Sequence, residues 1–456
     1  TLQQQGKLEK SIVAYNKAVS LKPDYADAYN NVGNAFRDQG QLKEAIEAYK
    51  IALSLEPSYA EVHNNIGLIL HQQGKLEESI ESFKKAILLK YNYADAYNNM
   101  GNTLKDKGQS EQAIAAYKTA ISLKPGYAVA HNNLSFVFLN IGRLREGLDE
   151  YEWRWKNPEN KSIRRHFLRP TWDSEKSLKC KRILLWSEQG IGDTINWSSV
   201  LSHISSQAEH CILECQEKLV PLLARSFPEV EVKPENRSLD SKRDDFDFHI
   251  PLGSLYRQLI TKISQKTKAD AYLIPDPVRV NFWRKRLNSL GNGPYVGISW
   301  KSSKMTPERM QNYAPILEWS PILRLPDITF INLQYKDFES DLAKVKNELG
   351  VKVHNFNDLD HYDNLVDVTA FSAALDIVVS IKNTVSLISA GVGTSTKLAN
   401  WRQSPWNNIL HNPIGRSVDI FERNTWELWD NVFSLIADNI HKQSKTKQST
   451  GVFKNE

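Results

Sequence analysis

A repeat with a period of 34 residues constrains the fold of this chain more than any other feature, and it runs from Thr1 to about Trp155. Each unit carries a small residue, a glycine at a turn and an aromatic residue at fixed spacing. In chain order these are Gly33, Gly67, Gly101 and Ser135; then Gly40, Gly74, Gly108 and Gly142; and finally Tyr49, Phe83, Tyr117 and Tyr151. Because such a unit buries its apolar face only against its neighbours, the period predicts a solenoid of paired helices.

The pattern resembles the tetratricopeptide family, which it matches at nearly every defining position. A second set of small residues marks where paired helices approach closely: Ala45, Ser79, Ala113 and Gly147. The segment Gly6–Pro23 supplies only the second helix of an earlier unit, and the chain starts at Thr1 without a Met. We therefore expect the natural N-terminus to lie upstream.

Paired asparagines recur in register along the repeats, and the second member of each pair falls on the helix that lines the inner groove in this family. These second members are Asn31, Asn65, Asn99 and Asn133. Stacked carboxamides offer donors and acceptors to an extended peptide backbone without reading its side chains. Similar asparagine ladders occur in the repeats of eukaryotic protein O-GlcNAc transferase. Two interpretations stay open: a groove for a peptide partner, or asparagines that satisfy local helix and turn geometry.

Composition excludes several classes of protein. The chain is 41% hydrophobic and 24% charged, which is typical of a globular protein rather than a disordered one. Its net charge of +5 gathers in Lys161–Arg182 and in the tail Lys442–Lys454, so we predict no nucleic-acid partner. No apolar run reaches the length of a membrane span. The three cysteines form no CxxC pair, so we expect reduced thiols in a cytoplasmic protein and no bound metal.

After the repeats, the stretch Arg182–Ile204 reads as a strand, a glycine turn and the start of a helix. The apolar run Ile183–Trp186 suits a buried strand, and Gly190 and Gly192 form the turn. At the start of a helix that follows a strand and a glycine turn, backbone N–H groups and the helix dipole can bind a ligand.

Strands and helices alternate through the rest of the chain in two halves. Further strands are predicted at Cys211–Cys215, Phe246–Ile250, Tyr295–Trp300, Ile328–Leu333, Val351–Phe356 and Ile377–Ser380. This order predicts an α-solenoid followed by an α/β pair of Rossmann-type domains. We place the repeats at 1–156, a linker at 157–181, the first half at 182–280, the second half at 281–441 and a disordered tail at 442–456.

The junction of the two regions carries a second and more specific resemblance. The repeats end in YEWRW, a Pro-x-Trp linker follows at Pro170–Trp172, and the first strand and turn read LLWSEQGIGD. These motifs resemble a bacterial family of repeat-bearing proteins whose C-terminal domain is similar to glycosyltransferase family 9, the heptosyltransferases. The resemblance implies the GT-B architecture, with a C-terminal helix at Trp426–Ile440 that crosses back onto the first half. It also implies transfer from a nucleotide sugar without metal or other cofactor.

The resemblance assigns roles to several residues around the predicted cleft. Asp193 matches the catalytic base of the heptosyltransferases, although an Asp at this position could instead be a helix N-cap. Lys301 and Arg309 match basic residues that contact the donor phosphates. Gly192 belongs to the phosphate-facing turn, and Gln334 matches a residue that lines the donor pocket.

One segment departs from the family pattern. Relatives carry Asp, Thr and His in the motif SVDTAVAHLAGALG, whereas this chain has Lys382, Asn383 and Leu387 in Ser380–Leu387. Lys382, Asn383 and Thr384 could still bind phosphate oxygens at a helix start.

The leading hypothesis is therefore a glycosyltransferase with a UDP-, ADP- or GDP-linked sugar donor and a protein or peptide acceptor recruited by the repeats. The alternative is a tetratricopeptide scaffold whose GT-B-like domain has lost catalysis.

Overall fold

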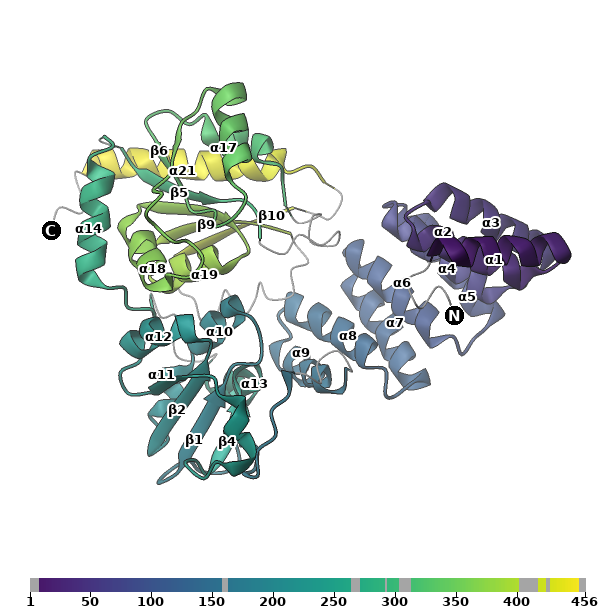
Figure 1. Cartoon of the computed structure of the whole chain (residues 1–456), viewed down its shortest axis with the longest axis horizontal. Helices are drawn as coiled ribbons and strands as arrows, with labels where there is room; N and C mark the ends of the chain where they lie inside the picture. Colours follow the sequence, from purple (N-terminus) through teal and green to yellow (C-terminus); the bar gives the residue numbers. More distant parts are fainter. Residues whose placement is uncertain are drawn as a thin grey trace. The chain divides into compact units, whose positions relative to one another are not determined.

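The computed structural model describes residues 8–157, 163–263, 271–291, 293–302, 313–401, 417–423 and 427–450. The chain divides into two compact units, Thr1–Ile141 and Gly142–Glu456, each with its own core (Figure 1).

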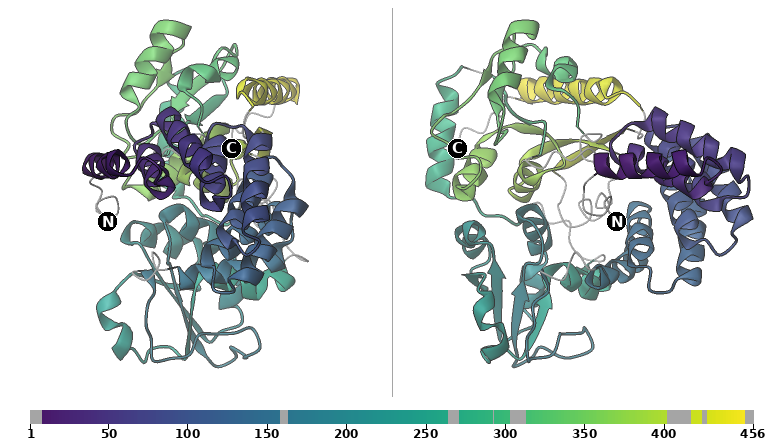
Figure 2. Two further views of the ribbon diagram at one scale, coloured as in Figure 1. Left: turned by 90° about the vertical axis from the view of Figure 1, so that its right-hand side faces the viewer. Right: turned by 45° about the vertical axis from the view of Figure 1, so that its right-hand side comes forward.

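The first unit is a series of helices that pack in consecutive pairs, as the repeat predicts (Figure 2). Turn glycines with positive φ separate the helices of a pair; Gly40, for example, has φ of 79°. The helices are α1 (Leu8–Leu21), α2 (Ala26–Asp38), α3 (Leu42–Leu55), α4 (Ala60–Gln72), α5 (Leu76–Leu89), α6 (Ala94–Asp106), α7 (Ser110–Leu123) and α8 (Ala128–Asn140).

Small residues and aromatic residues meet inside each helix pair. A Cβ added to Gly33 would lie 2.4 Å from the ring of Tyr49, and one added to Gly67 would lie 2.7 Å from Phe83. Both rings are fully buried. An aromatic side chain of one helix thus fills the space left by the glycine of its partner, and this close approach fixes how the two helices pack.

The second unit begins with α9 (Leu144–Tyr151) and η1 (Glu152–Lys156), followed by a first lobe around a parallel sheet with strand order β3-β2-β1-β4. The strands are β1 (Arg182–Trp186), β2 (His210–Cys215), β3 (Glu231–Pro234) and β4 (Phe248–Pro251). The helices of this lobe are α10 (Ile191–Ser198), α11 (Leu201–Ser205), α12 (Val220–Ser226) and α13 (Leu252–Ile263), with the short turn η3 (Glu217–Leu219).

The second lobe is built on a larger parallel sheet with strand order β10-β9-β8-β5-β6-β7. Its strands are β5 (Tyr295–Ser299), β6 (Thr329–Asn332), β7 (Val353–His354), β8 (Ile377–Ile381), β9 (Ser395–Trp401) and β10 (Val418–Arg423). Its helices are α14 (Pro277–Asn288), α16 (Ser320–Leu323), α17 (Glu339–Lys344), α18 (Leu365–Ala374), α19 (Thr384–Gly391) and α21 (Asp430–Thr450). An α/β region with parallel sheets is therefore confirmed.

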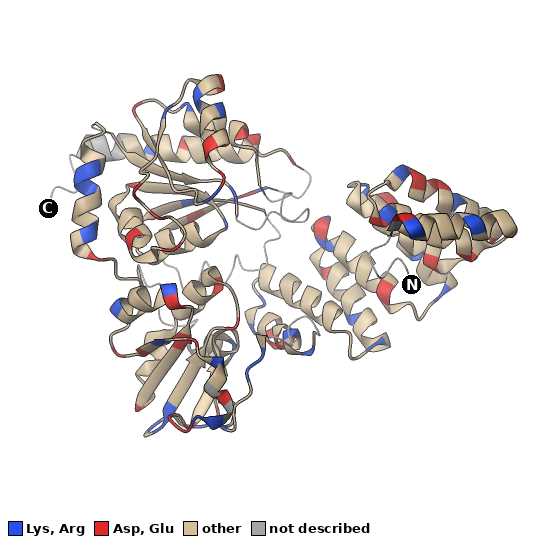
Figure 3. Ribbon diagram, in the orientation of Figure 1, with Lys and Arg blue, Asp and Glu red and all other residues tan. Residues whose placement is uncertain are grey.

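Helix α14 links the lobes and carries a row of basic residues, which stand out in Figure 3. Arg279 forms two hydrogen bonds of 2.6 Å with the carboxylate of Asp367, and the indole N–H of Trp283 donates to the same group at 2.8 Å. Trp283 is fully buried. These contacts attach α14 to the second lobe, because Asp367 lies on α18.

The structure corrects several details of the prediction. Strands β3, β9 and β10 were not predicted, and β7 is shorter than the predicted Val351–Phe356. Helix α21 does not cross onto the first lobe in its described contacts, because Phe433, Ile436 and Ile440 belong to the core of the second lobe. It also continues to Thr450, so part of the tail predicted to be disordered is helical. Residues 451–456 lie outside the described residues.

Candidate functional site

Two helix starts, one from each lobe, meet at facing edges of the second unit (Figure 1). Helix α10 follows β1, and α19 follows β8, so both helices begin at the carboxyl ends of parallel strands. A Cβ added to Gly192 on α10 would lie 3.2 Å from Leu387 and 3.5 Å from the hydroxyl of Thr384 on α19. Ligands of α/β proteins bind in such crevices outside the carboxyl ends of strands.

Asp193 lies in the first turn of α10, where the helix dipole stabilises a negatively charged side chain. The N-cap position is occupied by Gly190, so Asp193 is not the N-cap residue of this helix. Its Oδ2 would lie 3.6 Å from a Cβ added to Gly190, which places the carboxylate over the helix start.

Lys382 lies next to Asn383, the N-cap residue of α19, and interacts electrostatically with Asp193. Burial lowers the pKa of Lys382 from its usual value to about 7, and the negative charge of Asp193 opposes this shift. The two residues that sequence reasoning named from distant motifs are thus brought together across the lobes.

Asn383 organises the start of α19. Its side chain accepts a hydrogen bond from the backbone N–H of Ser386 at 3.2 Å, and the Ser386 hydroxyl accepts one from the backbone N–H of Asn383 at 3.2 Å. This reciprocal capping box satisfies helix N–H groups that have no partner inside the helix. The Asn383 amide also donates to the hydroxyl of Ser299 at 2.8 Å. Its carboxamide is therefore engaged in positioning the loop.

Lys301 follows β5, the strand beside β8, and its backbone carbonyl lies 3.5 Å from the amide of Asn383. The Lys301 ammonium forms an ion pair of 2.8 Å with Asp341 on α17. To contact a phosphate, this ammonium must either bind the phosphate and Asp341 at the same time or break its ion pair with Asp341.

Gln334 is 1% exposed and lies against the backbone of Trp300 and Lys301, which follows β5. Its side-chain carbonyl accepts hydrogen bonds from the backbone N–H groups of Trp300 and Lys301 at 3.1 and 3.0 Å. It supports the turn from below. Arg309 lies outside the described residues.

A buried ion pair that the sequence did not reveal holds the loop before α10. Glu188, 5% exposed, accepts hydrogen bonds of 3.1 Å from Arg154 of η1 and from the backbone N–H of Gly253. Burial raises the pKa of Glu188 to about 7, although the charge of Arg154 opposes the shift. A Cβ added to Gly253 would lie 2.4 Å from the Glu188 carboxylate, so a larger residue at this position would displace that carboxylate.

The two lobes are joined beside the site by the segment around Tyr272. The Tyr272 hydroxyl donates to the backbone carbonyl of Ile195 on α10 at 3.0 Å. The backbone N–H groups of Tyr272 and Leu273 both donate to the carbonyl of Gly391 on α19 at 2.9 Å. These bonds connect the two helices whose starts form the candidate site.

In the first unit the asparagines form hydrogen bonds between successive repeats. Asn65 donates to Asn30, Asn99 to Asn64 and Asn133 to Asn98, each at 3.0 Å. The second member of one pair thus contacts the first member of the preceding pair, which neither interpretation of the sequence specified. Each donating amide is half-buried and keeps a second N–H group.

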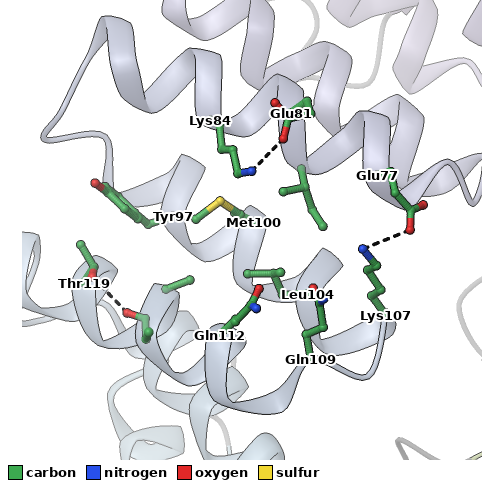
Figure 4. A pocket seen from close by; sticks show the side chains of 13 residues that line it. Glu77, Glu81, Lys84, Tyr97, Met100, Leu104, Lys107, Gln109, Gln112 and Thr119 are labelled. Carbon is green, nitrogen blue, oxygen red and sulfur yellow. Dashed lines mark hydrogen bonds and ion pairs between the residues drawn. The ribbon is translucent and has the colours of Figure 1, made fainter.

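A cavity of about 510 Å³ opens between α5, α6 and α7, and Figure 4 shows its lining. Its floor includes Met100 and Leu104, and ion pairs of Lys84 with Glu81 and of Lys107 with Glu77 lie at its rim. A cavity of equal volume lies between α1, α2 and α3, lined by equivalent positions two repeats earlier. The repeats therefore form the same hollow more than once.

Among the described residues, no group of three or more His, Cys, Asp or Glu side chains could hold a metal ion. Within the same part of the chain, no helix is long and apolar enough to cross a membrane.

Comparison with known proteins identifies the repeats. Residues 2–36, 33–74, 67–108 and 101–142 match the family model described as TPR repeat, so the tetratricopeptide prediction is confirmed there. Protein FlbA of Caulobacter vibrioides is 31% identical over 317 residues, which are 66% of this chain and 53% of that protein. The chain thus spans about half the length of this curated relative.

Solved structures resemble this chain over about a third of its length. A crystal structure of MamA is 26% identical, covers 36% of this chain and 95% of its own, and has a TM-score of 0.32. YrrB, a TPR protein with an unusual peptide-binding site, is 20% identical, covers 35% of this chain and 83% of its own, and has a TM-score of 0.29.

Proposed function

We propose that the second unit is a GT-B-type glycosyltransferase that transfers a sugar from a nucleotide-sugar donor to a protein or peptide bound by the repeats. One observation carries this proposal. The starts of α10 and α19 meet at the carboxyl ends of two parallel sheets, with Asp193 on one side and Lys382 on the other.

Glycosyl transfer breaks the bond between the anomeric carbon and the diphosphate oxygen and forms a bond from that carbon to an acceptor hydroxyl oxygen. The departing diphosphate gains negative charge, so fixed positive charge beside it lowers the barrier. Lys382 and the N–H groups at the start of α19 are the groups we assign to this role. A bound diphosphate would raise the pKa of Lys382 from about 7 and thereby favour its charged form.

The acceptor hydroxyl loses its proton as the new bond forms. We assign this proton to the carboxylate of Asp193, which acts as general base from the first turn of α10. Gly192 leaves room for the sugar beside Thr384, since an added Cβ there would already contact α19. Lys301 is a second phosphate ligand in this proposal, once donor binding competes with Asp341 for its ammonium.

The acceptor is a peptide segment bound along the asparagine ladder. Asn65, Asn99 and Asn133 each use one N–H group for the neighbouring repeat and keep the other for a peptide carbonyl. Contacts to the peptide backbone would accept many sequences, so we expect broad acceptor tolerance.

Calorimetry with UDP-, ADP- and GDP-linked sugars, followed by a transfer assay, tests the proposal. One donor should bind, and Asp193→Asn should keep donor affinity while lowering turnover by about a hundredfold or more. Asp244→Asn, an exposed carboxylate of the same lobe, is the matched control and should turn over normally. Turnover by Asp193→Asn equal to that of the control would remove Asp193 as the base.

A non-catalytic scaffold is the second candidate function. It is favoured by Asn383, whose carboxamide is engaged in capping, and by Lys301, whose ammonium is paired with Asp341. A scaffold of this kind should bind none of the nucleotide sugars in the same calorimetric panel, while still binding peptides through the repeats.

A further inference from the structure

A third cavity lies in the second unit, on the first lobe, and has a volume of about 490 Å³. It is enclosed by the linker segment 164–173, the end of β4 and the first turns of α13. Polar and charged side chains make up much of its wall, in contrast to the hollows between the repeats. None of the residues assigned to glycosyl transfer lines it.

Positive charge without a counter-ion gathers at this cavity. Of its lining arginines, Arg165 pairs with Glu214 at 2.7 Å, and Arg257 pairs with Asp149 at 2.5 Å. Arg164 and Arg169 also line the cavity and are exposed, and within the part of the chain that the structure describes neither has an ion pair or a side-chain hydrogen bond.

The acidic residues of the wall are already engaged. Glu152 pairs with Arg154 at 2.7 Å and accepts a hydrogen bond from Ser254 at 2.8 Å. Asp173 pairs with Lys176 at 3.3 Å. The two free guanidinium groups therefore leave the cavity with an excess of positive charge.

The imidazole of His249 also lies on the cavity wall. Burial lowers the pKa of His249 to about 4, and the charge of Arg165 lowers it further. Its Nδ1 accepts a hydrogen bond from the indole N–H of Trp186 at 3.4 Å. The neutral ring is thus held in place between the sheet and the linker.

The linker is held rigidly against the lobe. Trp172 donates its backbone N–H to the carbonyl of His249 at 2.9 Å, and the N–H of His249 donates to the carbonyl of Pro170 at 3.2 Å. Arg165 has a fully buried side chain that also hydrogen-bonds Asp240 at 2.9 Å. Arg164 and Arg169 are each followed by a residue that is hydrogen-bonded to the lobe, Arg165 and Pro170 respectively, which reduces the order that has to be gained when a ligand binds.

We propose that this linker cavity is a second binding site, which takes a small molecule that carries a phosphomonoester group. Guanidinium groups bind phosphate through paired, charge-assisted hydrogen bonds, and two of them match the charge of a phosphomonoester dianion. The volume lies within the usual range for small-molecule sites. Thr171 and Gln258 line the same cavity and supply polar groups for the rest of the ligand.

Titration calorimetry of the full chain with glucose 6-phosphate tests the proposal, with glucose as the uncharged control. We expect saturable binding of glucose 6-phosphate alone. Arg164→Gln and Arg169→Gln should each weaken it about tenfold, as expected for the loss of a charge-assisted hydrogen bond. Arg324→Gln, an exposed arginine of the second lobe, is the matched control and should leave affinity unchanged.

NMR of isotope-labelled imidazole rings tests whether the ligand binds in this cavity. The His249 resonance should shift on saturation, whereas that of His361 in the second lobe should not. The probe contains no nucleotide, so the result is independent of the proposed sugar transfer. The proposal is overturned by an absence of saturable binding, by equal affinity of the two arginine variants and the control, by an unmoved His249 resonance, or by equally tight binding of inorganic phosphate or an acidic peptide.

Discussion

Gly67→Ala should destabilise the first unit, although alanine is the better helix former. Gly67 lies within α4, and a Cβ there would approach three ring atoms of Phe83 at 2.7, 2.9 and 2.9 Å. Carbon atoms prefer to be separated by roughly 3.5 to 4.0 Å, so ring and helix must move apart by roughly half an ångström or more. Phe83 is fully buried in α5 and has no open space to enter.

Two opposing effects set the size of the change. Overpacking of a well-packed core costs about 1 to 3 kcal/mol. Replacement of glycine by alanine inside a helix gains about 1 kcal/mol. We therefore expect Gly67→Ala to lower the free energy of unfolding by about 1 kcal/mol, within a range of roughly 0 to 2 kcal/mol.

Urea unfolding, followed by far-UV circular dichroism, measures the effect. Gly126→Ala is a control for the gain of a Cβ without a clash, because Gly126 lies in the turn before α8, a Cβ there meets nothing within 4 Å and its φ is not positive. Phe83→Leu should relieve the clash, so the double variant should be more stable than the two separate losses predict. A Gly67→Ala variant stabilised as much as the Gly126→Ala control would refute the steric reasoning.

Two further predictions concern charge and hydrogen bonding. Burial holds the folded-state pKa of Lys382 at about 7, below its usual 10.5, so the unfolded chain binds more protons between these pH values. The free energy of unfolding should therefore rise as pH increases from about 7. Urea titrations should show this rise smaller by at least about 1 kcal/mol in Lys382→Met. The exposed control Lys285→Met should show the same rise as the unchanged chain. The side-chain carbonyl of Asn64 accepts a hydrogen bond from the Asn99 amide at 3.0 Å, and Asn99→Asp would place a carboxylate against that carbonyl. It should destabilise the first unit by about 1 to 3 kcal/mol, more than Asn99→Ala does, and equal urea midpoints for the two variants would contradict this.

Periodic features of the sequence were sufficient to predict the first unit. Gly67 and Phe83 recur in register with Gly33 and Tyr49, and their contacts follow from local helix geometry. In the second unit, β1 and β5 were also predicted nearly to the residue, because each is a short apolar run before a turn.

Other elements lacked a local signal. Strands β9 and β10 were not predicted, and β9 includes Lys397, a fully buried lysine that pairs with Asp419 of β10. A lysine in a segment argues against its being a buried strand, unless the acidic residue that pairs with the lysine is known. That partner lies on the neighbouring strand, so the pairing exists only once the sheet has formed.

The candidate site shows the same division. Asp193 could be named from the resemblance of its glycine turn to the heptosyltransferases, and Lys382 and Thr384 from a helix start, where backbone N–H groups bind phosphate. The chain alone could not show that Asp193 faces Lys382, or that Asn383 and Gln334 are engaged in supporting the turns. Sequence by itself determined the periodic helices of the first unit and short apolar strands such as β1 and β5, since these depend on neighbours along the chain. Only tertiary structure decided which charges meet across the lobes, because burial and partners come from segments far apart in sequence.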